Sequence, residues 1–327
     1  MRAVIATVAG GPEVLSVADM PDPEPGPDQV LVRLAAAGVN FIDTYRRSGT
    51  YRMPFPHVVG SEGAGVVERV GRDVTTIQPG ERVAWSAAPG SYAELVAVPV
   101  SAALVVPDGV PDDVAAALPL QGLTAHYLVT SSFRVEPGVT VLVHAGAGGV
   151  GLLLVQMAAA RGARVITTVG SAEKETLARR AGASEVIRYR ELANLTDELP
   201  ALVRDLTDGR GVEAVYDSVG RDTFDASLAS LARRGTLVLF GASSGAVPPF
   251  DPQRLNAAGS VFLTRPTLGD HTRDRAELDW RASEVFGAVQ DGSLDVRIGA
   301  TYPLADAAEA HRALESRSTT GKVLLIP

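Results

Sequence analysis

The stretch VTVLVHAGAGGVGLLLVQMAAARGARVITTV, residues 139–169, constrains the fold of this 327-residue chain more than any other feature. An apolar strand-like segment enters the pattern G-x-G-x-x-G, formed by Gly146, Gly148 and Gly151, and an apolar helix-like segment leads on to a second strand. The first glycine permits the tight turn, the second lets a pyrophosphate approach the backbone, and the third allows close helix–strand packing. Because a helix N-terminus favours phosphate charge, the stretch predicts a dinucleotide-binding βαβ unit, and glycines that serve packing alone are the less favoured alternative.

The end of the second predicted strand indicates which dinucleotide is bound. An NAD site usually has Asp or Glu about 20 residues further on, to accept a hydrogen bond from the ribose 2′-hydroxyl. Here the strand ends with Thr-Val-Gly-Ser at residues 168–171, without an acid. Lys174 follows in the same loop, and Tyr189 lies between two arginines at the end of the third predicted strand, so cations and a hydroxyl can meet a 2′-phosphate. We therefore expect NADPH rather than NADH; the alternative is that Lys174, which lies between two glutamates, is a solvated helix residue.

The pattern of predicted secondary structure changes twice along the chain. The N-terminal part consists of short β-rich segments separated by Pro and Gly clusters, which is typical of an irregular, mostly antiparallel sheet. From residue 122 apolar strands alternate with helical stretches, the pattern that builds a parallel sheet covered by helices. The final part again contains short strands like those of the N-terminal part, together with a helical stretch. We expect an α/β fold with a doubly wound parallel sheet of the Rossmann type in residues 122–265 and a mostly β domain in residues 1–121 and 266–327.

Composition excludes several classes of protein and of site. The chain has no cysteine, which excludes disulfides, iron–sulfur clusters, thiolate nucleophiles and Cys-ligated zinc within it. Its net charge of -8 disfavours a nucleic-acid partner. No apolar run approaches the roughly 20 residues of a membrane span, and the N-terminus lacks the continuous apolar core of a signal peptide. We expect a water-soluble protein of the cytoplasm, without a membrane partner.

Seven segments, one of them within the glycine-rich stretch, are spread over nearly the whole chain: NFIDTYRRSGTY, GSEGAGVVERVG, GLTAHYL, HAGAGGVG, YDSVGRDT, FGASSGAV and LTRPTLG. Together they resemble the quinone oxidoreductases of the zeta-crystallin type, within the medium-chain dehydrogenase/reductase superfamily. The resemblance implies a GroES-like catalytic domain built from the two chain ends and a Rossmann domain from the middle of the chain. It also implies NADPH in the cleft between the two domains and, commonly, a homodimer.

The resemblance bears on metal binding as well. Zinc-containing members of the superfamily hold their catalytic zinc with Cys and His ligands, and their G-H-E-x-x-G signature reads G-S-E-G-A-G here, at residues 60–65. The five histidines of the chain are scattered without H-x-x-x-H spacing, and isolated histidines are more often hydrogen-bonded structural residues. We therefore expect a zinc-independent enzyme with no metal site.

A set of cofactor-binding positions follows from the same resemblance. Those near the nicotinamide are Asn40, Phe41, Ile42, Asp43, Thr44 and Thr124, and Gly148, Gly149, Val150 and Gly151 lie at the pyrophosphate beside Gly146. The ribose phosphate is surrounded by Ser171, Lys174 and Tyr189. The remaining groove is lined by Ser218, Gly241, Ala242, Ser243, Ser244, Thr264, Arg265 and Arg317.

The expected reaction is reduction of a small quinone by NADPH. A quinone is already electron-poor, so the site needs a correct hydride distance and a donor for the developing oxyanion rather than a Lewis acid. The candidate catalytic residues are Asn40, Tyr45 and Tyr51. Asn40 orients the reactants, and Tyr51 lies where the related enoyl-thioester reductases place a tyrosine in N-x-x-D-x-x-x-x-x-G-x-Y. Alternatively, the two tyrosines are walls that pack on a flat substrate, and solvent supplies the proton.

Two other functions remain open at the level of sequence. An NADPH-dependent reductase of activated carbon–carbon double bonds, in 2-alkenals or enoyl thioesters, would share the cofactor domain and the positions of Asn40 and Tyr51. A non-catalytic NADPH-binding protein with a structural or RNA-binding role is the alternative of another class. The acidic balance of the chain disfavours the RNA-binding form of that alternative.

Overall fold

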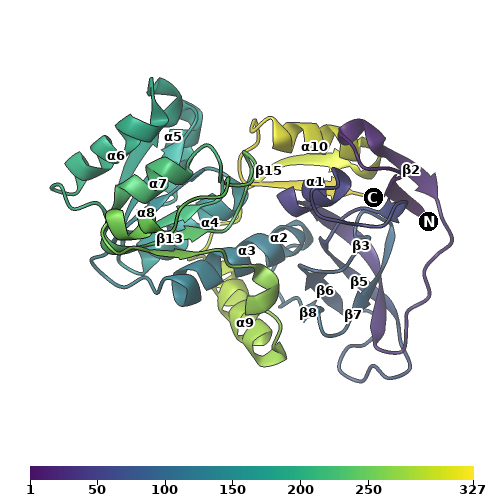
Figure 1. The fold of residues 1–327 in the computed structure, drawn as a ribbon. Coiled ribbons are helices and arrows are strands. Elements are labelled where there is room, and N and C mark those ends of the chain that lie inside the picture. Colours follow the sequence, from purple (N-terminus) through teal and green to yellow (C-terminus); the bar gives the residue numbers. More distant parts are fainter. The chain divides into compact units, whose positions relative to one another are not determined.

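The computed structural model describes residues 1–327, which form two compact units (Figure 1). Unit 1 comprises Met1–Leu123 and Arg275–Pro327, and unit 2 comprises Thr124–Asp274. The domain limits expected from the sequence, 121/122 and 265/266, lie two and nine residues from these. Unit 2 contains a parallel sheet and unit 1 contains separate sheets that are mostly antiparallel, so the predicted α/β fold class is confirmed.

Unit 2 is built around a six-stranded sheet of order β11-β10-β9-β12-β13-β14, in which every neighbouring pair is parallel. Counted along the unit, this is the order 3-2-1-4-5-6 of the Rossmann fold, which reverses its direction between β9 and β12. The elements are β9 (Thr140–Val143), α4 (Gly149–Ala160), β10 (Arg164–Val169), α5 (Ala172–Arg180), β11 (Glu185–Arg188), α6 (Leu195–Leu206), β12 (Val212–Asp217), α7 (Phe224–Ser230), β13 (Leu231–Leu239), α8 (Gln253–Ala257) and β14 (Phe262–Thr264).

The central strands of unit 2 are apolar because helices cover both faces of a doubly wound sheet. Four consecutive residues at the end of β12 are buried, as are the last five of β10 and the last three of β9. The helix α7 ends at Ser230, although helix-forming residues continue in the sequence as far as Arg234. Leu231 instead begins β13, where it pairs in parallel with Val212 of β12.

Unit 1 contains a three-stranded sheet of order β2-β1-β4 and a larger sheet of order β15-β16-β3-β5-β6-β8, with β7 also paired to β3. Its elements are β1 (Arg2–Ala6), β2 (Leu15–Asp19), β3 (Gln29–Val39), α1 (Phe41–Arg47), β4 (His57–Val58), β5 (Glu62–Val70), β6 (Arg82–Trp85), β7 (Leu95–Pro99), β8 (Leu104–Val105), α2 (Asp112–Ala117), α9 (Arg275–Gln290), β15 (Ile298–Pro303), α10 (Ala307–Glu315) and β16 (Lys322–Ile326), while α3 (Pro119–Tyr127) runs from unit 1 into unit 2. No helix in the structure has both the length and the apolar character that crossing a membrane requires.

The short helix α1 is attached to the C-terminal segment of the chain by buried polar contacts. Arg47, at the last position of α1, forms an ion pair with Glu315 of α10 at 2.6 Å and approaches Nδ1 of His311 at 3.0 Å. Because a guanidinium only donates, Nδ1 of His311 accepts and Nε2 carries the ring proton. Nε2 lies 3.2 Å from the hydroxyl of Tyr92, which in turn donates to the carboxylate of Asp43 in α1 at 3.1 Å. The N-terminal and C-terminal parts of unit 1 are thus joined through one directed chain of hydrogen bonds.

We expect His311 to make the stability of unit 1 sensitive to acid. Burial, and then the positive charge of Arg47, lower the pKa of His311 to about 3. In the unfolded chain the pKa is about 6.5, so the contribution of neutral His311 is complete above that value and is lost as the pH falls toward 3. Between about pH 7.5 and about pH 5 the free energy of unfolding should therefore fall by about 2 kcal/mol more in the wild type than in His311→Gln.

Chemical denaturation at the two pH values measures this difference. Burial raises the pKa of Asp43 to about 6, which has the opposite sign and favours the folded state as the pH falls. Asp43 is common to both proteins, so the comparison with His311→Gln isolates the histidine. Parallel pH profiles for the two proteins would contradict the expectation.

Candidate functional site

The three glycines of the turn between β9 and α4 have two different roles. A Cβ atom on Gly146 would lie 1.9 Å from Oγ1 of Thr167, and one on Gly151 would lie 2.2 Å from the carbonyl oxygen of Ala145. A Cβ atom on Gly148 would meet only that carbonyl oxygen, at 3.2 Å. The first and third glycines are therefore required by the packing of the protein itself. The second has free space before it at the N-terminus of α4, where a phosphate is favoured.

A buried network lies directly beneath this turn. Nδ1 of His144 is 3.0 Å from Oγ1 of Thr168, and Nε2 is 3.0 Å from Oγ of Ser227, which donates to Asp217 at 2.7 Å. These residues join the ends of β9, β10 and β12 through α7. Burial lowers the pKa of His144, so the ring is neutral and serves as a hydrogen-bonding spacer. The network fixes the strand ends from which the glycine turn departs.

The ends of β10 and β11 bring cationic groups together. Seen from Gly170, the nearest atoms to an added Cβ would be the hydroxyl oxygen of Tyr189 at 3.0 Å and, a little further, Nε of Arg190 at 3.4 Å. Burial and then the charge of Arg190 lower the pKa of Lys174, which lies in the first turn of α5 after the cap residue Ser171. Arg188, in contrast, forms ion pairs with two glutamates. From the sequence alone, Arg190 and Arg188 were equal candidates for contact with the phosphate. Only the fold shows that Arg188 is the one neutralised by glutamates.

The other predicted positions of unit 2, except Thr124 in α3, lie at or just after strand ends at the same edge of the sheet. Ser218 follows β12, and its carbonyl oxygen accepts a hydrogen bond from the backbone of Ser243 at 3.2 Å. Gly241 has no room for a side chain, because a Cβ atom would lie 2.4 Å from that same oxygen. The neighbouring Ala242 is half-buried and Ser244 is buried, Thr264 ends β14 with Arg265 next in the chain, and Thr124 is buried in α3. The carboxyl edge at a switch point is where open α/β sheets bind their ligands.

The predicted positions of unit 1 cluster on α1. Asn40 precedes the helix, and its backbone N–H donates to the carboxylate of Asp43 at 3.0 Å. Thr44 donates to the carbonyl of Phe41 at 2.8 Å, and Ile42 is half-buried. The other predicted residue of this unit, Arg317, follows α10 with a φ of 58°.

Three aromatic rings continue from α1 into the loop that follows. The ring centroids of Phe41 and Tyr45 are 6.1 Å apart, and those of Tyr45 and Tyr51 are 5.4 Å apart. The backbone N–H of Tyr51 donates to the carbonyl of Tyr45 at 3.0 Å, and the side chain of Tyr51 is 42% exposed. The structure thus brings the two candidate tyrosines together beside a third ring, in an arrangement on which a flat molecule can pack.

The side chain of Asn40 is held by two residues that the sequence analysis had not singled out. Its Nδ2 donates to Glu62 at 2.7 Å and to the carbonyl of Gly38 at 3.2 Å, and its Oδ1 accepts from Lys322 at 2.8 Å. Glu62 and Lys322 also form an ion pair with each other, and all three side chains are buried. Lys322 is distant from Asn40 in sequence and has no motif of its own, so only the fold reveals this contact.

Other potential sites are either absent or lined by different residues. No three His, Asp or Glu side chains lie close enough to hold a metal ion. Ser61, at the position of the His in the zinc signature, receives a hydrogen bond from Arg46 at 2.6 Å and donates to Asp43 at 2.7 Å.

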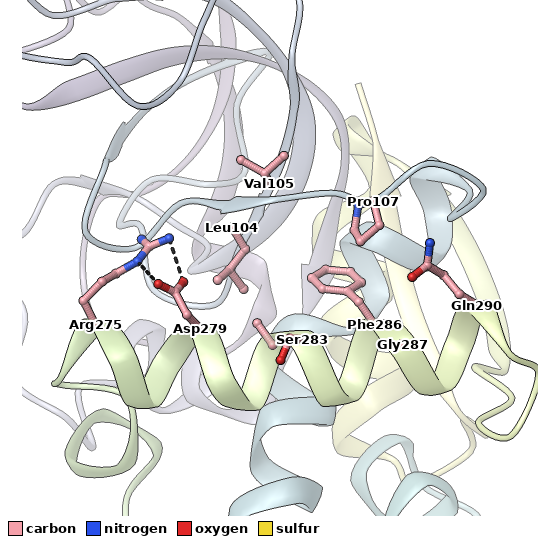
Figure 2. Close-up of a pocket in the computed structure, with 10 residues that line it drawn as sticks. Leu104, Val105, Pro107, Arg275, Asp279, Ser283, Phe286, Gly287 and Gln290 are labelled. Atoms are coloured by element: carbon pink, nitrogen blue, oxygen red, sulfur yellow. Dashed lines mark hydrogen bonds and ion pairs between the residues drawn. The ribbon is translucent and has the colours of Figure 1, made fainter.

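A pocket of about 340 Å³ lies between α9 and the segment around β8, with the 2.8 Å ion pair of Arg275 and Asp279 at one end (Figure 2). None of the predicted site residues lines this pocket.

Comparison with known proteins agrees with this reading of both units. Residues 26–108 match the alcohol dehydrogenase GroES-like domain, and residues 149–280 match the family described as zinc-binding dehydrogenase. A quinone oxidoreductase of Pseudomonas aeruginosa is 45% identical over 97% of this chain and 97% of its own length. A 2-haloacrylate reductase of a Burkholderia species is 39% identical over 100% of this chain and 99% of its own length.

A mycobacterial protein solved in complex with NADPH superposes with a TM-score of 0.97 at 54% sequence identity, and the match covers 100% of both chains. The fold and the glycine turn define a nucleotide-dependent oxidoreductase of the medium-chain dehydrogenase/reductase superfamily. Within that superfamily the chain belongs to the quinone oxidoreductase family.

We expect Gly148→Ala to separate ligand binding from stability. The new methyl group meets only one carbonyl oxygen, so the free energy of unfolding should change by less than about 1 kcal/mol. The affinity for NADPH, measured by fluorescence titration, should fall at least about tenfold, because the methyl group occupies the space for the pyrophosphate. Gly151→Ala is the matched control and should cost about 2 kcal/mol or more of stability, because its methyl group overlaps backbone. An unchanged NADPH affinity in Gly148→Ala would place the pyrophosphate elsewhere.

Proposed function

We propose that this chain is an NADPH-dependent quinone reductase, which transfers hydride to a small electrophilic quinone without a metal. The observation that carries the proposal is the match to quinone oxidoreductases over nearly the whole chain. The architecture supports it, because a Rossmann sheet with the glycine turn lies in unit 2 and a separate, mostly antiparallel unit carries the candidate catalytic residues. In functional terms, residues 122–265 bind the nucleotide and residues 1–121 with 266–327 form the catalytic domain.

The carboxyl edge of the unit 2 sheet fits NADPH. Gly148 leaves room for the pyrophosphate, and Lys174, Tyr189 and Arg190 converge where a 2′-phosphate is expected. The charge of Arg190 disfavours a second cation at Lys174, and a phosphate dianion between them would relieve this repulsion. No acid at the end of β10 is available to accept a hydrogen bond from a ribose 2′-hydroxyl. When bound, NADPH supplies the hydride; the protein supplies position and hydrogen bonds.

The α1 side of the site fits a flat, electron-poor acceptor. Phe41, Tyr45 and Tyr51 offer aromatic surface, and a tyrosine hydroxyl is a donor for the oxygen that gains charge on reduction. The positions that carry zinc ligands in other superfamily members hold residues that hydrogen-bond to protein groups here, as Ser61 does with Asp43. A zinc-independent reaction of a quinone is consistent with this donor set, because the acceptor is already activated.

The assembly and location of the enzyme are also part of the proposal. β14 is an edge strand of the unit 2 sheet, and Phe262 on it is 60% exposed. An open edge presents unpaired backbone groups to a second strand, so we propose a homodimer formed through β14. Sedimentation velocity, which reports the mass, tests this. We further propose that the enzyme acts in the cytoplasm.

A second function has a specific observation in its favour. The 2-haloacrylate reductase relative matches the whole chain, and the Asn40 to Tyr51 spacing is the one expected for reductases of activated double bonds. Oxidation of NADPH, followed by absorbance with ortho- and para-quinones, 2-alkenals and an enoyl thioester, separates the two. Turnover with quinones supports the proposal, and turnover only with the alkenes replaces it. A protein that binds NADPH without any turnover would be the non-catalytic alternative.

We expect the cations beside Tyr189 to discriminate between cofactors. Lys174→Ala and Arg190→Ala should each raise the Kd of NADPH about tenfold or more while changing the Kd of NADH less than about twofold, because only NADPH carries the 2′-phosphate. Arg188→Ala is the control and should affect neither, since its charge is already paired with glutamates. Equal losses for both cofactors in Lys174→Ala would refute the assignment.

We expect Tyr51 to act on the proton that accompanies hydride transfer. Tyr51→Phe should lower kcat for a quinone about tenfold or more and leave the affinity for NADPH unchanged, because it removes a donor and keeps the ring. Tyr45→Phe, in the preceding helix α1, is the comparison variant, and it identifies which of the two hydroxyls donates. If kcat is unchanged in both variants, the tyrosines are walls and solvent provides the proton.

A further inference from the structure

Three buried side chains of unit 1 form a closed cluster around the amide of Asn40. Lys322, the first residue of β16, donates from Nζ to Oδ1 of Asn40 at 2.8 Å and to Oε2 of Glu62. The same Oε2 accepts from Nδ2 of Asn40 at 2.7 Å, and Oε1 of Glu62 accepts from the backbone of Leu120 at 2.7 Å. Glu62 and Lys322 have no exposed side-chain surface. The contacts in the cluster therefore act at low effective dielectric, where attraction and repulsion between polar groups are both strong.

The two charges fix which end of the amide points where. The carboxylate of Glu62 faces the NH2 group of Asn40, and the ammonium of Lys322 faces its carbonyl oxygen. Rotation of the amide by half a turn would set the carbonyl oxygen against the carboxylate and the NH2 group against the ammonium, so both contacts would become repulsive. The orientation is thus determined by chemistry rather than by how the two amide atoms are assigned.

Counting donors and acceptors shows what Asn40 has left to offer. The NH2 group has two hydrogens, and these are directed at Glu62 and at the carbonyl of Gly38. The carbonyl oxygen has two lone pairs, of which Lys322 uses one. The nearby N–H of Asp43 donates at 3.1 Å to the backbone oxygen of Asn40, and the side chain makes no capping hydrogen bond. What remains is a single acceptor. Asn40 is therefore equipped to recognise a donor and is not equipped to donate to an oxyanion.

We propose that Glu62 and Lys322 are positioning residues that hold Asn40 as a hydrogen-bond acceptor for a hydroxyl or carboxamide N–H of the nicotinamide nucleoside. This inference rests on the proposed function, in which Asn40 lies at the nicotinamide end of NADPH. It assigns the donation of hydrogen bonds to the developing oxyanion to Tyr45, Tyr51 or water. It also gives the last strand of the chain, through Lys322, a role at the reacting end of the cofactor.

The backbone around the cluster is shaped to admit it. A Cβ atom on Gly38 would lie 2.2 Å from Oε2 of Glu62 and 2.7 Å from Cε of Lys322, so a larger residue at that position of β3 would displace both side chains. A buried ion pair is weak support for stability, because its desolvation offsets much of its attraction. Apolar side chains of the same size in place of Glu62 and Lys322 could not orient the amide of Asn40.

A double-mutant cycle on the full-length protein tests whether Lys322 acts through Asn40. The variants are Lys322→Met, Asn40→Ala and the two combined, with the Kd of NADPH measured by fluorescence titration and kcat/KM for NADPH measured with para-benzoquinone. Each single variant should weaken NADPH about tenfold, and the double variant should be no weaker than Asn40→Ala alone, because the amide that Lys322 positions is gone. Lys322→Arg, which keeps a cationic donor, should restore most of the affinity.

Two controls separate positioning from a loss of structure. Arg82→Met removes a different cation of unit 1, which is only partly buried, pairs with Asp112 and contacts none of the three cluster residues. This variant should leave NADPH affinity unchanged. If Lys322→Met does not fold, Glu62→Gln combined with Lys322→Met removes both charges at once, and this pair takes its place in the cycle. The neutral amide that Glu62→Gln introduces can meet either end of the Asn40 amide, so the same weakening of NADPH is expected.

The outcomes are distinguishable from failure of the proposed function. Additive losses of affinity in the double variant, or full NADPH affinity in Asn40→Ala, would overturn the inference. A wild-type protein that binds NADPH but reduces no quinone would refute the proposed function, and the affinity cycle would still decide the role of Lys322. Hydrogen exchange of the Asn40 side-chain amide, followed by NMR, provides a readout without activity: exchange should be slow in the wild type and fast in Lys322→Met.

Discussion

The geometry of unit 1 depends on the attachment of α1 to the C-terminal segment of the chain through buried charges. Lys322 of β16 reaches Asn40 at the start of the helix, and Arg47 at its end reaches Glu315 of α10. A seven-residue helix has little stability of its own, so its position must be set by tertiary contacts. Because both anchoring cations are buried, α1 has one well-defined place on the sheet, and the rings of Phe41 and Tyr45 are fixed with it.

In unit 2 the corresponding constraint is the close packing of the glycine turn. The network of His144, Thr168 and Asp217 ties three strand ends together, and Gly146 and Gly151 let the turn and the helix pack at the shortest distances. Gly148, in contrast, is half-buried, and a Cβ atom there would meet only one carbonyl oxygen. Such preorganisation lowers the cost of binding, since little has to be ordered when the dinucleotide arrives.

The sequence predicted the parts of this architecture that depend on local patterns. The glycine spacing, the alternation of apolar strands and helices, and the lack of an acid after β10 are each contained in a short stretch, and they led to the Rossmann-like fold and to NADPH. Contacts between residues that are far apart in the sequence could not be predicted in this way. Nothing in the sequence around Lys322 indicates Asn40 as its partner, and nothing near Arg190 and Arg188 reveals that only Arg188 is neutralised by glutamates. Local sequence does not show where α7 ends either, because the helix-forming residues 231–234 continue its sequence and yet lie in β13.

The polar groups around α1 bear on the kind of acceptor that the enzyme can reduce. Ser61, Asp43 and Asn40 are largely occupied by hydrogen bonds to other protein groups, and none of them has a spare donor for a developing oxyanion. What faces outward is aromatic surface and tyrosine hydroxyl, of which Tyr51 is the most exposed. A site of this kind orients a flat molecule and gives modest help to a developing negative charge. It therefore favours substrates whose own electronic structure already accepts hydride, and quinones and conjugated carbonyl compounds share that property.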